Sequence, residues 1–189
     1  YVTNVSASAY VPVWGISTWA LNYFRSDAQV RSPGLTDRAA IAAQQGLFCA
    51  PGDAPCQAAL TARVNNILAA NTNGSAEALG GQYRLRAYPQ SRFQGAHTEY
   101  LSTELRINVT EEFTPFDYVF FKGIRTGIQI APFYEIGTVA ESASALWALN
   151  RADYGVGARL ITASGAVYRL DVAVGDEGTG TTITINYPW

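Results

Sequence analysis

Apolar and polar residues alternate over much of this chain with the two-residue period that is typical of β-strands. The first alternating run extends from Asn4 to Val13, and the second extends from Ile16 to Arg25. Trp14 and Gly15 separate the two runs. This spacing predicts a β-hairpin with a tight turn at the Trp-Gly pair.

Five more alternating runs follow. Their apolar rows lie within Leu101 to Val109, Ile128 to Ile136, Val156 to Leu160, Tyr168 to Val174 and Ile183 to Trp189. The polar rows opposite them carry charges of both signs, at Glu104, Arg106, Glu135, Arg159, Arg169 and Asp171. The pattern therefore predicts an all-β chain with an antiparallel sheet of about seven strands.

A long segment interrupts the alternation between the second and third predicted strands. Two of its stretches, Thr36 to Gln45 and Ala54 to Ala70, are rich in alanine and are predicted as short helices. Insertions of this length are usually functional or disordered. We expect residues 26–99 to form a large external loop. A separate small helical domain is the alternative, but the segment has few apolar residues for a core of its own.

Two cysteines, Cys49 and Cys56, bracket a short segment rich in proline and glycine within this loop. An even pair at this spacing is typical of a disulfide formed in an oxidising compartment. Zinc binding is disfavoured because a structural site needs four ligands, and the single histidine, His97, lies far away in the sequence. We expect no metal, no cofactor and no enzymatic activity, since His97 also lacks the neighbours of a catalytic triad.

Composition narrows the possible partners. The 189 residues are 48% hydrophobic and 15% charged, and no apolar run approaches the roughly 20 residues of a transmembrane helix. The net charge of -2 gives no basic surface for nucleic acid. Because methionine is absent, we expect the sequence to be part of a longer chain.

An alternating antiparallel sheet can belong either to a membrane barrel or to a soluble sandwich, and the polar rows distinguish the two. Only one lysine is present, Lys122, and the inward charges of both signs suit an enclosed, wet lumen. Aromatic residues are predicted to gather at strand ends, as expected at a membrane interface; they include Phe113, Phe116, Tyr118, Phe120, Tyr187 and Trp189. An open edge is not tolerated in lipid, so we expect further barrel strands outside this sequence or a partner.

The segment from Gly80 to Gly95, which we call the arginine loop, interleaves arginines with aromatic residues. Its sequence resembles the Gly-Gly, Val-Arg-Gly-Phe/Tyr and Arg-Phe-x-Gly motifs of the BamA/TamA superfamily of outer-membrane insertases and secretion translocators. The matching residues are Gly80, Gly81, Leu85, Arg86, Ala87, Tyr88, Arg92, Phe93 and Gly95, with Ala87 where the family favours Gly. Downstream segments resemble the last strands of these barrels in the same order.

The resemblance implies that Arg86 enters the lumen and pairs with an acidic residue on the second strand after the loop. By position this residue is Glu135, where the family usually has Asp, and Glu104 is the second candidate. We expect this contact to act as a latch that a charge exchange between Arg86 and Glu135 would partly restore. Arg106, Arg159, Arg169 and Asp171 are expected to be lumen charges that balance one another.

The resemblance further implies that the chain is the C-terminal part of a bacterial outer-membrane barrel of about sixteen strands, within the usual range for such barrels. Its partners would be membrane lipid, client polypeptides, the remaining strands, and periplasmic domains or accessory proteins. The last strand, expected from Thr181 to Trp189, would form one side of a seam where client strands add, weakened by Pro188. A passive pore, or a barrel that anchors or exports a soluble domain such as a lipase, is the alternative.

Overall fold

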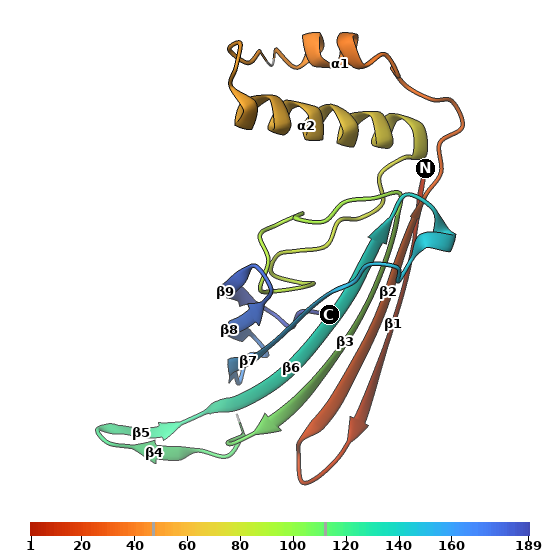
Figure 1. The fold of residues 1–189 in the computed structure, drawn as a ribbon. Helices are drawn as coiled ribbons and strands as arrows, with labels where there is room; N and C mark the ends of the chain where they lie inside the picture. The colour runs from red at the N-terminus through yellow and green to blue at the C-terminus, as the bar shows by residue number, and fades with distance from the viewer. Residues whose placement is uncertain (47, 112) are drawn as a thin grey trace.

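The computed structural model describes residues 1–46, 48–111 and 113–189. Seven strands form one antiparallel sheet in the order β1-β2-β3-β6-β7-β8-β9, which confirms the predicted all-β antiparallel class. Their bounds are β1 Val2–Pro12, β2 Thr18–Ala28, β3 His97–Asn108, β6 Thr126–Ala140, β7 Arg151–Thr162, β8 Val167–Gly175 and β9 Gly178–Ile185. The sheet is strongly curved, and no hydrogen-bonded pairing joins β1 to β9 among the described residues (Figure 1).

The long loop between β2 and β3 covers residues 29–96, because both strands extend further than the sequence pattern predicted. It contains the helices α1 Arg38–Gln44 and α2 Ala54–Asn73, close to the predicted ranges. The helices pack on each other through Ile41 and Val64 and project beyond one end of the sheet (Figure 1). The predicted disulfide is present, with the Cα atoms of Cys49 and Cys56 5.7 Å apart.

Neither helix is long and apolar enough to cross a membrane, as judged over the residues that the structure describes.

The two faces of the sheet have opposite polarity. On β8, the side chains of Arg169 and Asp171 on the concave, inner face are each 1% exposed, whereas Leu170 on the convex, outer face is 43% exposed. The same inversion recurs on the neighbouring strands, whose outer faces expose Trp19, Leu101, Ile130, Tyr134, Tyr154, Val156, Leu160 and Val172. In the described residues no second sheet covers this outer face, unlike the layered packing of a soluble sandwich.

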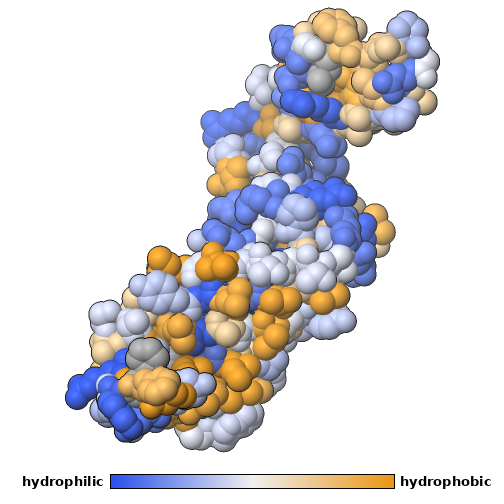
Figure 2. All heavy atoms as spheres, turned by 90° about the vertical axis from the view of Figure 1, so that its left-hand side faces the viewer, coloured by the Kyte–Doolittle hydropathy of each residue, from blue (hydrophilic) through white to orange (hydrophobic). Residues whose placement is uncertain are grey.

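Charged residues on the outer face lie at one end of the sheet. Arg25, Asp27 and Glu99 face outward at the ends of β2 and β3 nearest the helices, where Arg25 pairs with both carboxylates. His97 begins β3 and contacts Asp27 at 2.7 Å, so it lies in a strand and not in the external loop that was expected over residues 26–99. Figure 2 shows apolar side chains gathered over the lower half of the body and hydrophilic ones above them.

Two further strands were not predicted. β4 Phe116–Tyr118 and β5 Phe121–Ile124 form a small hairpin beyond the end of the sheet that lies opposite the helices (Figure 1). It carries several of the aromatic residues expected at strand ends, and Tyr118 and Phe120 are 66% and 92% exposed.

The last strand lies earlier in the chain than predicted, since it begins at Gly178 and not at Thr181. β9 ends at Ile185, and Asn186 adopts a left-handed backbone conformation with a φ of 76° that turns the chain away from the ladder. Asparagine tolerates this conformation better than most residues. Tyr187 and Trp189 therefore do not continue the outer apolar row, and the C-terminal end lies on the concave side (Figure 1). Pro188 lies outside the strand, so it does not weaken β9 pairing as the sequence suggested.

Candidate functional site

The arginine loop lies on the inner face of the sheet, where it forms most of the apolar core together with the strands (Figure 1). Leu79 pairs with Phe93 as an isolated antiparallel bridge that closes the loop. Leu85 and Tyr88 are buried against Phe24, Tyr100, Phe133 and Ala173 of the sheet. The loop is thus packed as an internal element and is not a solvated connector.

Glycine is required where the loop turns sharply. Gly80 has a φ of 102°, and a Cβ atom there would lie 2.3 Å from the carbonyl oxygen of Pro89. Leu85 is the motif residue other than glycine that has a left-handed backbone, at a φ of 54°. Ala87 has no positive φ, which explains why alanine fits where the resembling family favours glycine.

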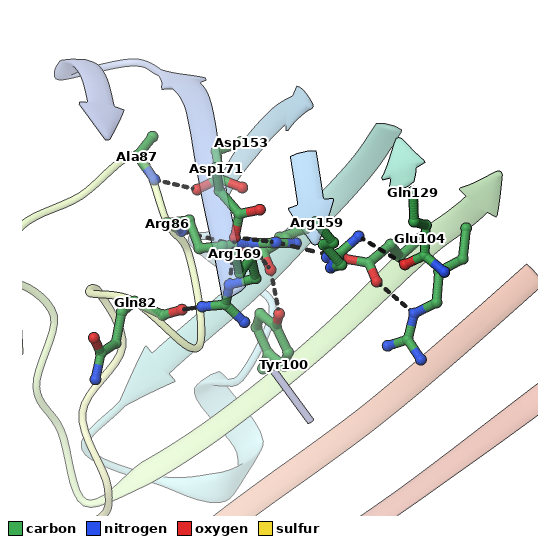
Figure 3. A network of polar contacts seen from close by, with 12 residues as sticks. Gln82, Arg86, Ala87, Tyr100, Glu104, Gln129, Asp153, Arg159, Arg169 and Asp171 are labelled. Atoms are coloured by element: carbon green, nitrogen blue, oxygen red, sulfur yellow. Dashed lines mark hydrogen bonds and ion pairs between the residues drawn. The ribbon is translucent and has the colours of Figure 1, made fainter. Parts of the chain in front are cut away.

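Arg86 is the centre of a buried charge network (Figure 3). Its Nε donates to Glu135 Oε1 at 3.0 Å, and its backbone nitrogen donates to the other oxygen of the same carboxylate at 2.9 Å. Its Nη1 donates to Asp171 Oδ2 at 2.8 Å and lies 3.4 Å from Glu104 Oε2. The structure therefore brings Arg86 together with both of the carboxylates expected from the sequence and with a third.

Phe133 and Tyr100 complete the surroundings of this arginine. The guanidinium lies over the ring of Phe133, with Cζ 3.4 Å from the centroid. The Tyr100 hydroxyl donates to Glu135 Oε1 at 2.6 Å. Burial alone would lower the pKa of Arg86, but the carboxylates of Glu135, Asp171 and Glu104 outweigh it and hold the pKa above its ordinary value. Arg86 is therefore a fixed cation.

Glu104 links the other predicted lumen charges to Arg86. It accepts hydrogen bonds from Arg159 Nη2 at 2.6 Å and Arg106 Nε at 2.7 Å. Asp171 contacts Arg169 Nε at 2.9 Å, and Arg169 Nη2 donates to the carbonyl oxygen of Gln82 in the arginine loop at 2.6 Å. These charges form one connected network with the loop and do more than balance one another (Figure 3).

Asp153 belongs to the network but was not predicted. Its Oδ2 accepts a hydrogen bond from the backbone nitrogen of Ala87 at 2.7 Å, and it pairs in register with Glu135 on the adjacent strand. With it, the network has equal numbers of buried arginines and carboxylates, none more than 7% exposed: Arg86, Arg106, Arg159 and Arg169, with Glu104, Glu135, Asp153 and Asp171. Seven of these side chains form ion pairs with one another, whereas Asp153 instead accepts from the loop backbone, so most of the buried charge is paired.

The strands lack side chains where the loop lies closest to them. A Cβ atom at Gly180 of β9 would lie 2.3 Å from the Arg86 carbonyl oxygen and 2.8 Å from Ala87 Cα. A Cβ atom at Gly137 of β6 would lie 2.5 Å from Leu79 Cδ1. The atoms that meet Gly180 belong to the loop backbone and could not accommodate a Cβ atom without a shift, so Gly180 forms the seat of the loop.

Arg106 extends the network to the final residues. Its Cζ lies 4.3 Å from the ring centroid of Tyr187, 5.0 Å from that of Trp189 and 5.3 Å from that of Tyr10. Tyr10 of β1 and Trp189 are themselves in contact, with centroids 6.3 Å apart. The residues after β9 thus cross the inner face toward β1, at the opposite edge of the sheet.

The structure contains no cluster of three or more potential metal ligands in its described residues. The site is a set of buried ion pairs around a docked loop, and such an arrangement can hold a segment in place. Comparison of the chain with protein-family models, with curated proteins and with solved structures gave no match.

Proposed function

We propose that this chain is part of an outer-membrane β-barrel that inserts or translocates polypeptides, as the resemblance to the BamA/TamA superfamily suggests. The observation that carries the proposal is the inverted polarity of the sheet, with eight charged side chains buried on the inner face and aliphatic side chains exposed on the outer face. In water this exposed apolar surface would be unusually large. Lipid outside and a polar lumen inside account for both faces.

The height of the outer apolar band supports this proposal. On β6 the apolar row from Ile128 to Ile136 extends about 26 Å along the strand, at a rise of about 3.3 Å per residue. At the roughly 35–45° tilt of membrane barrels, this length gives a height of about 20 Å, close to the apolar band of about 25 Å on such barrels. The charged side chains of Arg25, Asp27 and Glu99 begin where the band ends.

The free edge of β9 supports a role in strand addition. Its only hydrogen-bonded neighbour among the described residues is β8, and its sequence is rich in threonine and glycine without a charge. An unprotected edge of this kind can accept another strand through backbone hydrogen bonds. We infer that a client strand pairs there, in a barrel completed by strands beyond this sequence.

A charge on the outer face tests whether lipid covers it. Leu170→Arg is expected to cost about 2–4 kcal/mol of folding free energy if Leu170 faces the bilayer interior. In water the same change at a 43% exposed position would cost within about 0.5 kcal/mol. Urea unfolding of the intact protein in lipid bilayers measures the difference.

Thr3→Arg is the matched control, because Thr3 faces outward beside Asp27 at the charged end of the sheet. We expect it to cost less than about 1 kcal/mol, as near a membrane interface. Equal and small costs for both variants would refute a lipid-covered outer face.

Activity on a client separates an insertase from a passive pore or an anchor. Reconstituted in liposomes, the protein is expected to accelerate the folding of an unfolded outer-membrane porin relative to empty liposomes. A bilayer-inserted protein that leaves the porin folding rate unchanged would favour the anchor.

A further inference from the structure

The turn between β8 and β9 is bound to the arginine loop by an ion pair that the sequence pattern did not indicate. Arg92 Nε lies 2.7 Å from Glu177 Oε2, and Arg92 Nη2 lies 2.9 Å from Glu177 Oε1. This is the bidentate geometry in which a planar guanidinium matches a carboxylate. Arg92 belongs to the loop motif, whereas Glu177 immediately precedes β9.

Tyr88 makes a second connection to the same turn. Its hydroxyl accepts a hydrogen bond from the Asp176 backbone nitrogen at 3.2 Å and donates one to the Ala152 carbonyl oxygen at 3.0 Å. Its ring fills the space at Gly175, where a Cβ atom would lie 2.8 Å from Tyr88 Cζ. Burial raises the pKa of Tyr88 above its ordinary value, so the hydroxyl remains a donor at neutral pH.

These contacts matter because β9 is an edge strand. It is held by β8 on one side, and on its inner face by the loop atoms that meet Gly180. β9 itself therefore has few other interactions to fix its position. Edge elements with few contacts open locally at low free energy unless something holds them.

We propose that docking of the arginine loop and placement of β9 are energetically coupled through the Arg92–Glu177 ion pair and the Tyr88–Asp176 hydrogen bond. The consequence of this coupling for client strands rests on the proposed function. A client strand that displaces β9 from β8 would also loosen the docked arginine loop. Coupling of this kind is reciprocal, so a loosened loop would equally release β9.

The two contacts are expected to contribute unequally. Arg92 and Glu177 have side chains that are 50% and 35% exposed, so salt weakens their attraction. Tyr88 is 3% exposed, and loss of its hydroxyl leaves the partly buried Asp176 backbone nitrogen and Ala152 carbonyl oxygen without this partner. The Arg92–Glu177 ion pair is therefore expected to break more readily, and the Tyr88 hydrogen bond is expected to contribute more to the coupling.

Hydrogen exchange of backbone amides in the intact protein, purified in detergent micelles, tests the coupling. Glu177→Gln is expected to raise exchange by up to about fivefold, as for an exposed ion pair, and Tyr88→Phe by about tenfold, as for a lost buried hydrogen bond. The increase must appear in both segments, the β9 amides that pair with β8 and the amides of residues 80–95.

Glu77→Gln is the matched control. It makes the same chemical change and removes the partner of Arg84, another loop arginine, but Glu77 does not contact the β8–β9 turn. We expect unchanged exchange in β9. Combining Arg92→Glu with Glu177→Arg is expected to return exchange in both segments toward the original rates.

The coupling is refuted if Glu177→Gln and Tyr88→Phe leave β9 exchange unchanged, or if Glu77→Gln raises it equally. This measurement does not depend on activity. Coupled exchange in a protein without any effect on porin folding would refute the proposed insertion role alone, whereas uncoupled exchange in an active protein would refute only this inference.

Discussion

Arg86→Ala is expected to destabilise the protein by about 3–5 kcal/mol, as for removal of one partner from a buried ion pair. The change leaves Glu135, Asp171 and Glu104 in a buried site without the cation they share. It also removes the guanidinium that stacks on Phe133. The measurement is the free energy of unfolding in urea for the intact protein in detergent micelles.

Arg84→Ala is the control for this prediction. Arg84 lies in the same loop and its guanidinium also stacks on a ring, with Cζ 3.5 Å from the Phe24 centroid, but its ion-pair partner Glu77 has a side chain that is 47% exposed. We expect a cost of about 1 kcal/mol or less, as for most exposed pairs. Similar unfolding free energies for the two variants would contradict a special role of Arg86.

The charge exchange that the sequence suggested is no longer expected to restore stability. A glutamate at position 86 would face Asp171 and Glu104, because Arg86 contacts both in addition to Glu135. An arginine at position 135 could not accept the hydrogen bond from the backbone nitrogen of residue 86. The double variant Arg86→Glu with Glu135→Arg should therefore be no more stable than either single variant.

Gly180→Val is expected to prevent docking of the arginine loop. The added Cβ atom would lie 2.3 Å from the Arg86 carbonyl oxygen, so the backbone of the loop must move away from β9. Because this movement separates Arg86 from its carboxylates, the cost should reach about 3 kcal/mol, the range for breaking a buried pair. Unfolding in urea measures the cost, and faster proteolysis within residues 80–95 would report the undocked loop.

Thr181→Val is the control, since it introduces the same residue at the next position, which is exposed and on the other side of β9. We expect no change in cleavage of the loop and a change in stability within about 0.5 kcal/mol. Equal cleavage rates in the original protein and the Gly180→Val variant would show that the loop does not need this glycine.

Strand alternation predicted the sheet well, because a two-residue period determines which side chains share a face. It also placed Glu135 and Arg159 inward without knowledge of the loop. The proximity of Arg86 to Glu135 came instead from the resemblance, since no local pattern relates residues 49 positions apart. The two observations together located the centre of the site.

Asp153 was missed because the predicted strand began two residues after it. Every second residue back from Arg159 on β7 faces inward, through Gly157 and Gly155 to Asp153. The two-residue alternation in the sequence therefore already placed Asp153 on the inner face. A charge count gives a second signal, because the predicted strands carry three inward arginines and three inward carboxylates, and Arg86 from the loop leaves one carboxylate too few. The glycine seat left no such signal, since it depends on the approach of a distant loop.

The end of β9 was mispredicted for a different reason. Tyr187 and Trp189 continue the alternation of Ile183 and Ile185, so the pattern itself gave no boundary. A single left-handed residue, Asn186, redirects the chain, and contacts with Arg106 hold the two rings on the inner face. Tertiary contacts thus override the two-residue alternation at the end of β9, a strand that has a partner strand on one side alone among the described residues.

The balance of the charge network has an electrical consequence. Because four buried arginines are matched in number by four buried carboxylates, the inner wall carries little excess charge to attract either cations or anions. The docked loop also occupies space that an ion path along this wall would need. In a barrel built on this sheet, steady conductance would be small and unselective, and larger currents would come in discrete episodes when the loop leaves its seat.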